Sequence, residues 1–284
     1  MDAGRLEPAV PPPDPAEIAG LAAARAAVLS RIAEAAARAG REPASVTLVA
    51  VSKTVPANRL RAAVAAGHDV LGENRVQEAA AKVPLGPGPR WHLVGPLQAN
   101  KARRAVEIFD VLEAVGSVEL ARRLDRISTE VRPGRPLPIL LEVNVDADPG
   151  KAGFEPATVA EALPGLLTLA NLDVRGLMTI GRLTATPDEA RSTFRRLREL
   201  ATRLRATHPG LGPELSMGMS DDFELAIEEG ATIVRVGRAL FGERRVAHGP
   251  DDDPAPEPAG PAAGPARFAA GPVGPAAEPD HPAE

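Results

Sequence analysis

Short apolar runs alternate along this chain with segments whose apolar residues recur at helical spacing. The first apolar run, 47–53, is followed by a helical pattern at 58–66, and the same order recurs until a last apolar run at 232–237. Nearly continuous apolar strands separated by helices are typical of a parallel sheet covered on both faces. About eight such units predict a single α/β domain, a closed (β/α)8 TIM barrel. An open doubly wound sheet is the alternative.

The pattern predicts the individual elements as follows. Strands are predicted at 47–53, 69–73, 90–95, 108–115, 138–145, 172–180, 214–218 and 232–237. Helices are predicted at 18–39, 58–66, 76–83, 99–105, 118–127, 157–163, 187–207 and 220–228. Glycines at the ends of several helices support these boundaries, because glycine is favoured just after a helix.

The two ends of the chain differ from the region between them. Residues 1–15 are rich in proline, and residues 248–284 consist mainly of proline, alanine, glycine and acidic residues. Such segments bury too little apolar surface to offset their ordering entropy. We therefore predict disordered ends at 1–15 and 248–284 around a barrel at 16–247. A docking peptide is the alternative for the second segment.

Composition narrows the classes of function. Of 284 residues, 44% are hydrophobic and 25% charged, as in ordinary soluble proteins. The net charge of −5 argues against sequence-independent nucleic-acid binding. Apolar runs stay below the roughly 18 residues of a membrane span, and the first residues lack the pattern of a secretory signal, so we expect a cytoplasmic location. The sequence has no cysteine, and its histidines are scattered, so no metal site is predicted.

Chemistry in such a barrel gathers at the carboxyl ends of the strands. The residues expected there are Lys53, Gly72, Glu73, Asn74, His92, Gly95, Asn144, Met178, Ser216, Arg235 and Gly237. We expect them to surround one mouth of the barrel. A lone strand histidine such as His92 is more often a packing residue. Asp221 and Asp222 are expected to cap the helix that follows them.

One combination among these residues is more specific than the rest. Strands seven and eight of such barrels commonly form a phosphate site, and SMGMSDD and VRVGRALFG place glycines and Arg235 there. Lys53, from strand one, would face that site. A lysine opposite a phosphate cradle suggests pyridoxal phosphate (PLP) held as a Schiff base, with Arg235 at the pyridine nitrogen. The alternative is another phosphorylated metabolite that Lys53 contacts only as an ion-pair partner.

Several motifs together carry a resemblance to a known family. They are AVSKTVP, GHDVLGENRVQEAAAK, RWHLVGPLQANKAR, LEVNVDADPGKAGF, RGLMTI and LSMGMSDDFELAIEEGATIVRVGRALFGER. In order and spacing these resemble the pyridoxal phosphate homeostasis proteins, also called the YggS/PROSC family. The resemblance covers about residues 18–245 and leaves out both ends of the chain.

The resemblance implies an alanine-racemase-like barrel of fold type III with PLP on Lys53. It further implies that Asn74 and Met178 line the cofactor pocket, that Ser216 and the backbone at Gly237 hold the phosphate, and that Arg235 faces the pyridine nitrogen. Three positions depart from the family pattern. Arg75 replaces a common aromatic, Glu142 a common glutamine, and Arg238 a common small hydroxyl residue.

The choice between enzyme and carrier follows from what the sequence lacks. An alanine racemase uses a second acid/base group, a tyrosine from a second domain, and this sequence contains no tyrosine. A guanidinium at the pyridine nitrogen also weakens the electron sink. We therefore expect a PLP carrier or homeostasis protein with no catalytic residues, a monomer with apo PLP-dependent enzymes as candidate partners. A weak racemase or decarboxylase, with His92 or a water as substitute acid, is the alternative.

Overall fold

The computed structural model describes residues 12–83, 88–182 and 186–242. By its internal contacts the chain divides into a unit of residues 1–244 and a unit of residues 245–284. The predicted disordered segment 248–284 and most of the segment 1–15 lie outside the described residues. The barrel is therefore the part of the prediction that the structure tests.

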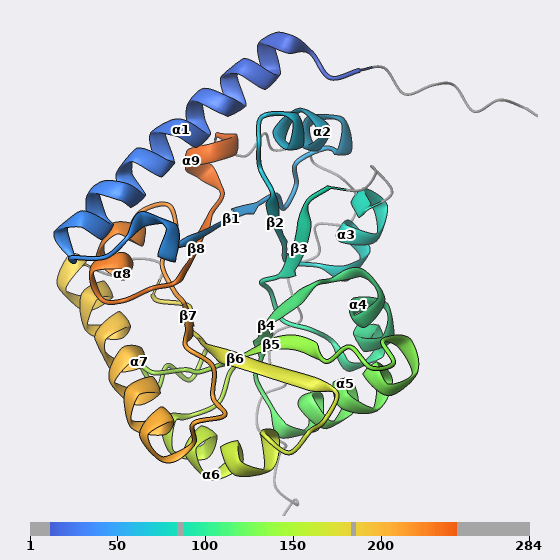
Figure 1. The fold of residues 1–284 in the computed structure, drawn as a ribbon, viewed down its shortest axis with the longest axis vertical. Helices are drawn as coiled ribbons and strands as arrows, with labels where there is room; N and C mark the ends of the chain where they lie inside the picture. The colour runs from blue at the N-terminus through green and yellow to red at the C-terminus, as the bar shows by residue number, and fades with distance from the viewer. Residues whose placement is uncertain (1–11, 84–87, 183–185, 243–284) are drawn as a thin grey trace, which may run out of the picture. The chain divides into compact units, whose positions relative to one another are not determined.

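All the strands are parallel and close into one barrel in chain order, β1 to β8. They are β1 (Thr47–Val51), β2 (Val70–Glu73), β3 (Arg90–Leu93), β4 (Val111–Val115), β5 (Leu137–Glu142), β6 (Leu172–Met178), β7 (Glu214–Ser216) and β8 (Ile233–Val236). Figure 1 shows these strands as an inner ring with helices outside it. The predicted (β/α)8 barrel is confirmed, and the open-sheet alternative is wrong, because β1 pairs with β8.

The helices cover the outer face of the barrel. They are α1 (Pro15–Arg38), α2 (Ala57–Ala65), α3 (Val76–Lys82), α4 (Ala102–Ile108), α5 (Val118–Val131), α6 (Pro156–Leu166), α7 (Pro187–Thr207), α8 (Phe223–Glu228) and α9 (Arg238–Phe241), with short 3-10 turns η1 (Pro43–Ser45) and η3 (Ala99–Lys101). The longest ones carry clear capping signals. Asp14 caps α1 ahead of Pro15, and Thr186 and Glu189 form a capping box on α7.

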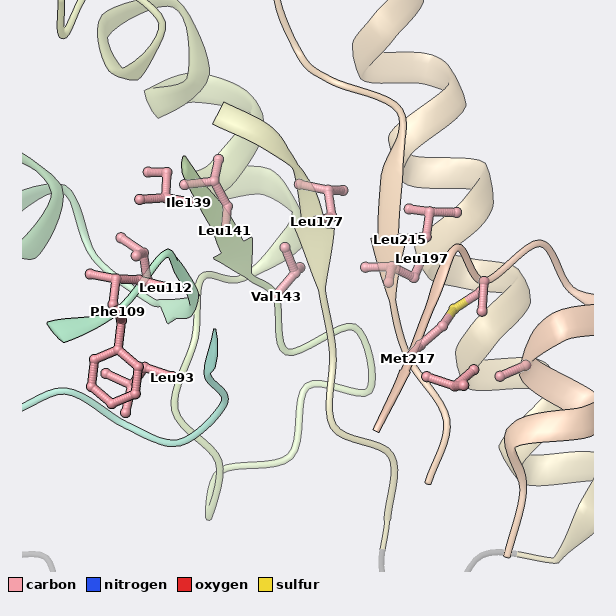
Figure 2. Close-up of a cluster of buried hydrophobic side chains, with 14 of the residues drawn as sticks. Leu93, Phe109, Leu112, Ile139, Leu141, Val143, Leu177, Leu197, Leu215 and Met217 are labelled. Carbon is pink, nitrogen blue, oxygen red and sulfur yellow. The ribbon is translucent and has the colours of Figure 1, made fainter. Parts of the chain in front are cut away.

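The apolar residues form two separate layers. The larger cluster lies between the outward faces of the strands and the helices, and Figure 2 shows part of it, with Leu112, Leu177 and Leu197 among its members. The smaller cluster takes side chains from most of the strands and so fills the barrel interior; its members are Val49, Val70, Val94, Val111, Ala114, Leu140, Met178 and Ile233. Because successive strand side chains point to opposite faces, a strand can contribute side chains to both layers.

Several predicted boundaries differ from the structure for local reasons. The strand expected at 108–115 begins at Val111, because Ile108 completes α4. The helix expected at 220–228 begins only at Phe223, since the preceding residues form the loop after β7. Helix α1 begins at Pro15, three residues before the predicted start, because Asp14 accepts the N–H of Ala16. The short helix α9 was not predicted.

Within the described residues, no helix combines the length and apolar character needed to cross a membrane. No group of three or more histidine, cysteine, aspartate or glutamate side chains in the same part of the chain is placed to hold a metal ion.

Candidate functional site

Lys53 stands at the mouth of the barrel, two residues beyond the end of β1. Val49 and Val51 pack in the interior cluster, and Lys53 follows in the turn after the strand. Ser52, which points the other way, is fully buried. Lys53 itself is half-buried. The chain thus places this lysine at the end of the barrel where the carboxyl ends of the strands meet.

The loops after β7 and β8 meet beside that amine-bearing strand. The register of β1 with β8 brings Gly237 beside Val51, and a Cβ built on Gly237 would lie 3.2 Å from the carbonyl oxygen of Val51. The N–H of Gly237 donates to the Oγ of Ser220 at 3.3 Å. Backbone N–H groups at the start of α9 have no acceptor within that helix. These donors and the hydroxyl suit an anion such as a phosphate.

A glycine in the β7 loop permits this close arrangement. Gly218 has φ of +91°, and a Cβ there would lie 2.9 Å from the Cα of Phe223 and 2.5 Å from the Cβ of Ala226. Both the backbone conformation and the space therefore require glycine. The carbonyl of Gly218 accepts the N–H of Arg235 at 3.0 Å, which ties the loop to β8.

Arg235 lies in the barrel interior, where a chain of hydrogen bonds fixes its guanidinium. It donates to the Oγ of Ser216 and to the carbonyl of Thr179, the latter at 2.8 Å. The Oγ of Ser216 donates in turn to Oε2 of Glu113 at 2.6 Å. Oε1 of Glu113 is 2.6 Å from Nδ1 of His92. We call these four side chains, those of His92, Glu113, Ser216 and Arg235, the interior network.

The carboxylate of Glu113 is the anionic centre of the interior network. Burial acts to raise the pKa of Glu113, but the hydrogen bond and charge of His92, together with Arg235 and Ser216, outweigh it, so the pKa lies below its usual value. Burial lowers the pKa of Arg235, and Glu113 and Glu142 oppose that shift. A guanidinium stays protonated nonetheless. The interior network therefore pairs one permanent cation with one carboxylate.

Glu142, at the end of β5, is a second acid near the same cation. Burial raises the pKa of Glu142, and the charge of Arg235 acts in the opposite direction. The family resemblance marks this position only as a departure from a common glutamine. A carboxyl whose neutral form is favoured resembles that glutamine more closely than an ionised carboxylate does.

The remaining predicted pocket residues lie on neighbouring strands. Met178 ends β6 and is fully buried in the interior cluster, in register with Ser216 on β7. Asn74 follows β2 and is half-buried. Gly95 permits its placement, because a Cβ on Gly95 would lie 2.6 Å from the backbone oxygen of Asn74. Met178, Ser216 and Arg235 thus come together in the barrel interior, and Asn74 lies just beyond the carboxyl end of β2.

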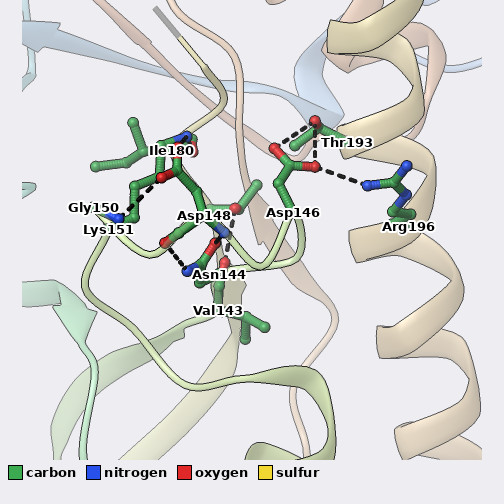
Figure 3. A network of polar contacts seen from close by, with 10 residues as sticks. Val143, Asn144, Asp146, Asp148, Gly150, Lys151, Ile180, Thr193 and Arg196 are labelled. Atoms are coloured by element: carbon green, nitrogen blue, oxygen red, sulfur yellow. Dashed lines mark hydrogen bonds and ion pairs between the residues drawn. The ribbon is translucent and has the colours of Figure 1, made fainter.

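The loop after β5 borders the same end of the barrel and is held by its own polar contacts (Figure 3). The side chain of Asn144 donates to the carbonyl of Asp148 at 2.7 Å and accepts the N–H of Asp148 at 3.1 Å. Lys151 donates to the carbonyl of Ile180 at 3.0 Å. Asp146 anchors the loop to helix α7. The side chain of Asn144 therefore stabilises the conformation of the loop after β5.

Two sequence predictions need correction. Glu73 faces outward, where it contacts Ser52 and Lys82 of α3, since it alternates with the inward-facing Gly72. Asp222 makes no side-chain cap of α8; its carboxylate accepts the N–H of Met219, which precedes the helix.

His92 is a buried, hydrogen-bonded packing residue, as expected. Sequence reasoning missed Glu113, although a lone acid in the otherwise apolar β4 was a signal. It also missed Lys82, although its spacing from Glu78 on a helix was visible. Ser220 lay within a quoted motif but was not singled out.

Comparison with known proteins identifies the family. The family model described as "Alanine racemase, N-terminal domain" matches residues 24–245. The pyridoxal phosphate homeostasis protein of Pseudomonas aeruginosa is 46% identical over 223 residues, which cover 77% of this chain and 94% of the relative. This chain belongs to the pyridoxal phosphate homeostasis protein family. The resemblance drawn from the sequence motifs is confirmed.

Other pyridoxal phosphate homeostasis proteins match to a similar extent. The protein of Aquifex aeolicus is 41% identical over 220 residues, covering 77% of this chain and 96% of the relative. Among solved structures, PipY of Synechococcus elongatus PCC7942 with PLP bound aligns with a TM-score of 0.70 and 45% identity, covering 78% of this chain and 100% of that chain.

Alanine racemase of Corynebacterium glutamicum shares only the fold with this chain. It aligns with a TM-score of 0.59 at 18% identity, covering 81% of this chain and 63% of the racemase. The barrel is therefore racemase-like in architecture, and the chemistry must be argued from the site.

Proposed function

We propose that this family member binds PLP as a Schiff base on Lys53 and takes part in intracellular PLP homeostasis and delivery. The amine of Lys53 condenses with the aldehyde carbon of PLP, forming a C=N bond with loss of one water. Of the relatives and neighbours, the homeostasis proteins carry this function in their name, and PipY was solved with PLP bound. When bound, PLP supplies an aldehyde that captures amines and a ring that accepts electrons.

One observation carries the proposal: strand β1, which leads to Lys53, is paired with β8, whose end helps to form the anion-binding loops. A molecule with an aldehyde at one end and a phosphate at the other would bridge the two. The donors are held by the barrel strands before any ligand arrives, which lowers the cost of ordering them.

The other lysines support the choice of Lys53. The sequence contains four lysines. The ammonium of Lys82 donates to three acceptors within 2.9 Å and is buried outside the barrel. Lys151 is bonded to the carbonyl of Ile180. Lys101 belongs to η3, after β3 and ahead of α4. Lys53 is the lysine that combines strand-end position with a place beside the β7 and β8 loops.

The geometry favours Ser220 over Ser216 for the phosphate. Ser216 was the sequence-based choice, but its hydroxyl is fully buried and already engaged by Glu113 and Arg235. Ser220 lies against the N–H of Gly237 instead. We propose that Ser220 and the backbone at Gly237 hold the phosphate and that Ser216 orients Arg235. Asn74 and Met178 keep their proposed place as pocket lining.

Arg235 is proposed to face the pyridine nitrogen. Its guanidinium is fixed by Ser216 and the carbonyl of Thr179, and it cannot lose its proton. A permanent cation disfavours a protonated pyridine nitrogen, so the ring withdraws electrons less strongly. This supports a holder of PLP rather than a racemase, as does the absence of tyrosine from the sequence.

The binding proposal is tested by absorbance and mass mapping. PLP is added to the purified full chain, the imine band is recorded, and borohydride then reduces the C=N bond to a stable amine. We expect the reduced adduct on Lys53, and loss of the band in Lys53→Ala but not in the control Lys101→Ala. An adduct on another lysine, or an unchanged band in Lys53→Ala, would overturn the assignment.

The carrier proposal is tested against the racemase alternative with L-alanine in D2O. A carrier leaves the α-proton in place, whereas a racemase exchanges it for deuterium, which mass spectrometry detects. His92 has Nδ1 engaged by Glu113 and Nε2 without a hydrogen-bond partner within the described residues. If exchange at enzymatic rates occurred and disappeared in His92→Gln, the racemase alternative would replace the carrier proposal.

The location, oligomeric state and partners of the protein stay predictions. We propose a cytoplasmic, monomeric protein that hands PLP to apo-enzymes. Light scattering of the purified chain measures its mass, and transfer is measured by mixing the PLP-loaded protein with an apo-enzyme in the presence of a scavenger for free PLP. Activation of the apo-enzyme that the scavenger abolishes would argue against direct delivery.

A further inference from the structure

Lys53 occupies a tight turn whose backbone is unusual. The N–H of Val55 donates to the carbonyl of Ser52 at 3.0 Å, which closes a turn with Lys53 and Thr54 at its centre. Thr54 has φ of +64°. That region favours glycine and is rare for a β-branched residue, because Cβ crowds the backbone. Something outside the turn must hold Thr54 in this conformation.

Helix α3 supplies the groups that hold the turn on both sides of Lys53. Oε1 of Glu78 accepts the N–H of Thr54. The ammonium of Lys82 donates to the carbonyl of Ser52 at 2.9 Å and to Oε1 of Glu78 at 2.8 Å. The residues before and after Lys53 are therefore bonded to two side chains one helical turn apart.

A buried carboxylate completes this arrangement. Oε1 of Glu73 accepts from Lys82 at 2.7 Å and from the hydroxyl of Ser52 at 2.6 Å. Glu73 is fully buried and Lys82 is 5% exposed. We call Ser52, Glu73, Glu78 and Lys82 the outer clamp, because they lie between the barrel strands and α3. Burying these charges costs free energy, and they lie beside a strained turn. Their arrangement therefore indicates that they position the turn.

We propose that the outer clamp positions the Lys53 amine for PLP capture, with Glu78 and Lys82 as positioning residues that bond to the backbone of the turn. The inference rests on the proposed function, since it concerns the lysine assigned there. Without the clamp, Thr54 relaxes to negative φ and turns the preceding side chain away from the mouth. Capture should weaken even where the fold is intact.

The first test compares two changes at one position. Glu78→Ala removes the acceptor of the Thr54 N–H, whereas Glu78→Gln keeps an acceptor oxygen of the same reach. We expect Glu78→Ala to raise the Kd for PLP and slow imine formation, each about tenfold, the factor of one lost hydrogen bond. Glu78→Gln should stay within about threefold of the unchanged protein.

The matched control is Glu107→Ala on α4. It breaks an exposed ion pair with Arg104 at i,i+3 spacing, much as Glu78→Ala breaks one with Lys82 at i,i+4. We expect unchanged PLP binding there. Urea unfolding of each variant separates loss of fold from loss of positioning, and all binding is measured where every variant is folded.

A second test needs no PLP. Amide exchange of Thr54 in the cofactor-free protein should be about tenfold faster in Glu78→Ala than in Glu78→Gln. Adding Thr54→Gly to Glu78→Ala should recover most of the lost PLP affinity, because glycine adopts positive φ without strain.

The outcomes distinguish the two proposals. If Glu78→Ala captures PLP as fast and as tightly as the unchanged protein, or if Glu78→Gln is impaired equally, the clamp has no positioning role and the Lys53 assignment stands. If the unchanged protein forms no borohydride-trapped adduct on Lys53, the proposed function fails and the inference fails with it.

Discussion

Two networks of buried charge lie on opposite faces of the same barrel wall. The interior network centres on Glu113 and Arg235, and the outer clamp on Glu73 and Lys82. Each contains a fully buried carboxylate beside a cation, yet the pKa of Glu113 is lowered and that of Glu73 is raised. In both cases burial is the largest influence and favours the neutral acid.

The hydrogen bonds and charges around each carboxylate explain the difference. Both oxygens of Glu113 have partners, His92 on one and Ser216 on the other. Glu73 has Ser52 and Lys82 on Oε1, while its Oε2 is buried without a partner. The charges of His92 and Arg235 add to the hydrogen bonds that lower the pKa of Glu113, whereas the negative charge of Glu78 acts with burial to raise the pKa of Glu73. The comparison teaches that the sign of the nearby charges and the spread of hydrogen bonds over both oxygens, rather than depth alone, set the direction of the shift.

The largest expected effect comes from removing the interior cation. Arg235→Met leaves Glu113 buried without its cation, so the free energy of unfolding should fall by about 3–5 kcal/mol at neutral pH. Urea denaturation measures it. Glu113→Gln in the same chain should restore part of the loss. Arg103→Met, which breaks an exposed pair with Glu130, is the control and should change stability by less than about 0.5 kcal/mol.

Removing the outer cation should cost less. Lys82→Met should lower the free energy of unfolding by about 2–3 kcal/mol at neutral pH, because Glu73 already favours its neutral form and can take up a proton. The loss should shrink on acidification as Glu73 protonates. A loss as large as that of Arg235→Met, or one that grows on acidification, would contradict the proposed difference between the networks.

The pH dependence of stability should have opposite signs for the two acids. The lowered pKa of Glu113 gives stability that is present above the pKa of the unfolded chain and lost as the pH falls through the folded value. The raised pKa of Glu73 gives stability that is present below the unfolded pKa and lost as the pH rises through the folded value.

Unfolding free energies of Glu113→Gln and Glu73→Gln across the pH range of carboxyl titration test this. The difference between unchanged protein and Glu113→Gln should decrease on acidification, and the difference for Glu73→Gln should increase. Parallel curves for the two variants would mean that the hydrogen bonds and charges around each acid do not decide the shift.

The smallest expected effect is at Arg238, which lies outside both networks. Its guanidinium is paired with Asp221 and exposed, so it is directed away from the interior. Arg238→Ser should change the free energy of unfolding by less than about 0.5 kcal/mol and PLP affinity by less than about threefold. A much larger loss of affinity, measured by absorbance titration, would show that the guanidinium reaches the phosphate.

Much of the fold followed from local pattern. The alternation of apolar runs and helical segments was enough for a closed parallel barrel, and helix α7 has the predicted bounds 187–207 because a capping box and a proline mark its start. Boundaries failed where neighbouring elements compete for the same residues, as at Ile108, which completes α4 instead of starting β4. Short helices such as α9 carry too few residues to show a period.

The site likewise combines features that the sequence predicted with features that only the structure revealed. By itself the sequence determined the barrel, the strand ends that carry Lys53 and Arg235, and the glycines of the β7 and β8 loops, because these depend on period and on residue type. Only the tertiary structure decided that Glu73 faces α3, that Ser216 serves Arg235 while Ser220 meets Gly237, and that Glu78 and Lys82 hold the turn of Lys53. Those contacts join residues from different elements, and the direction of each side chain depends on strand register and helix packing, which no local pattern contains.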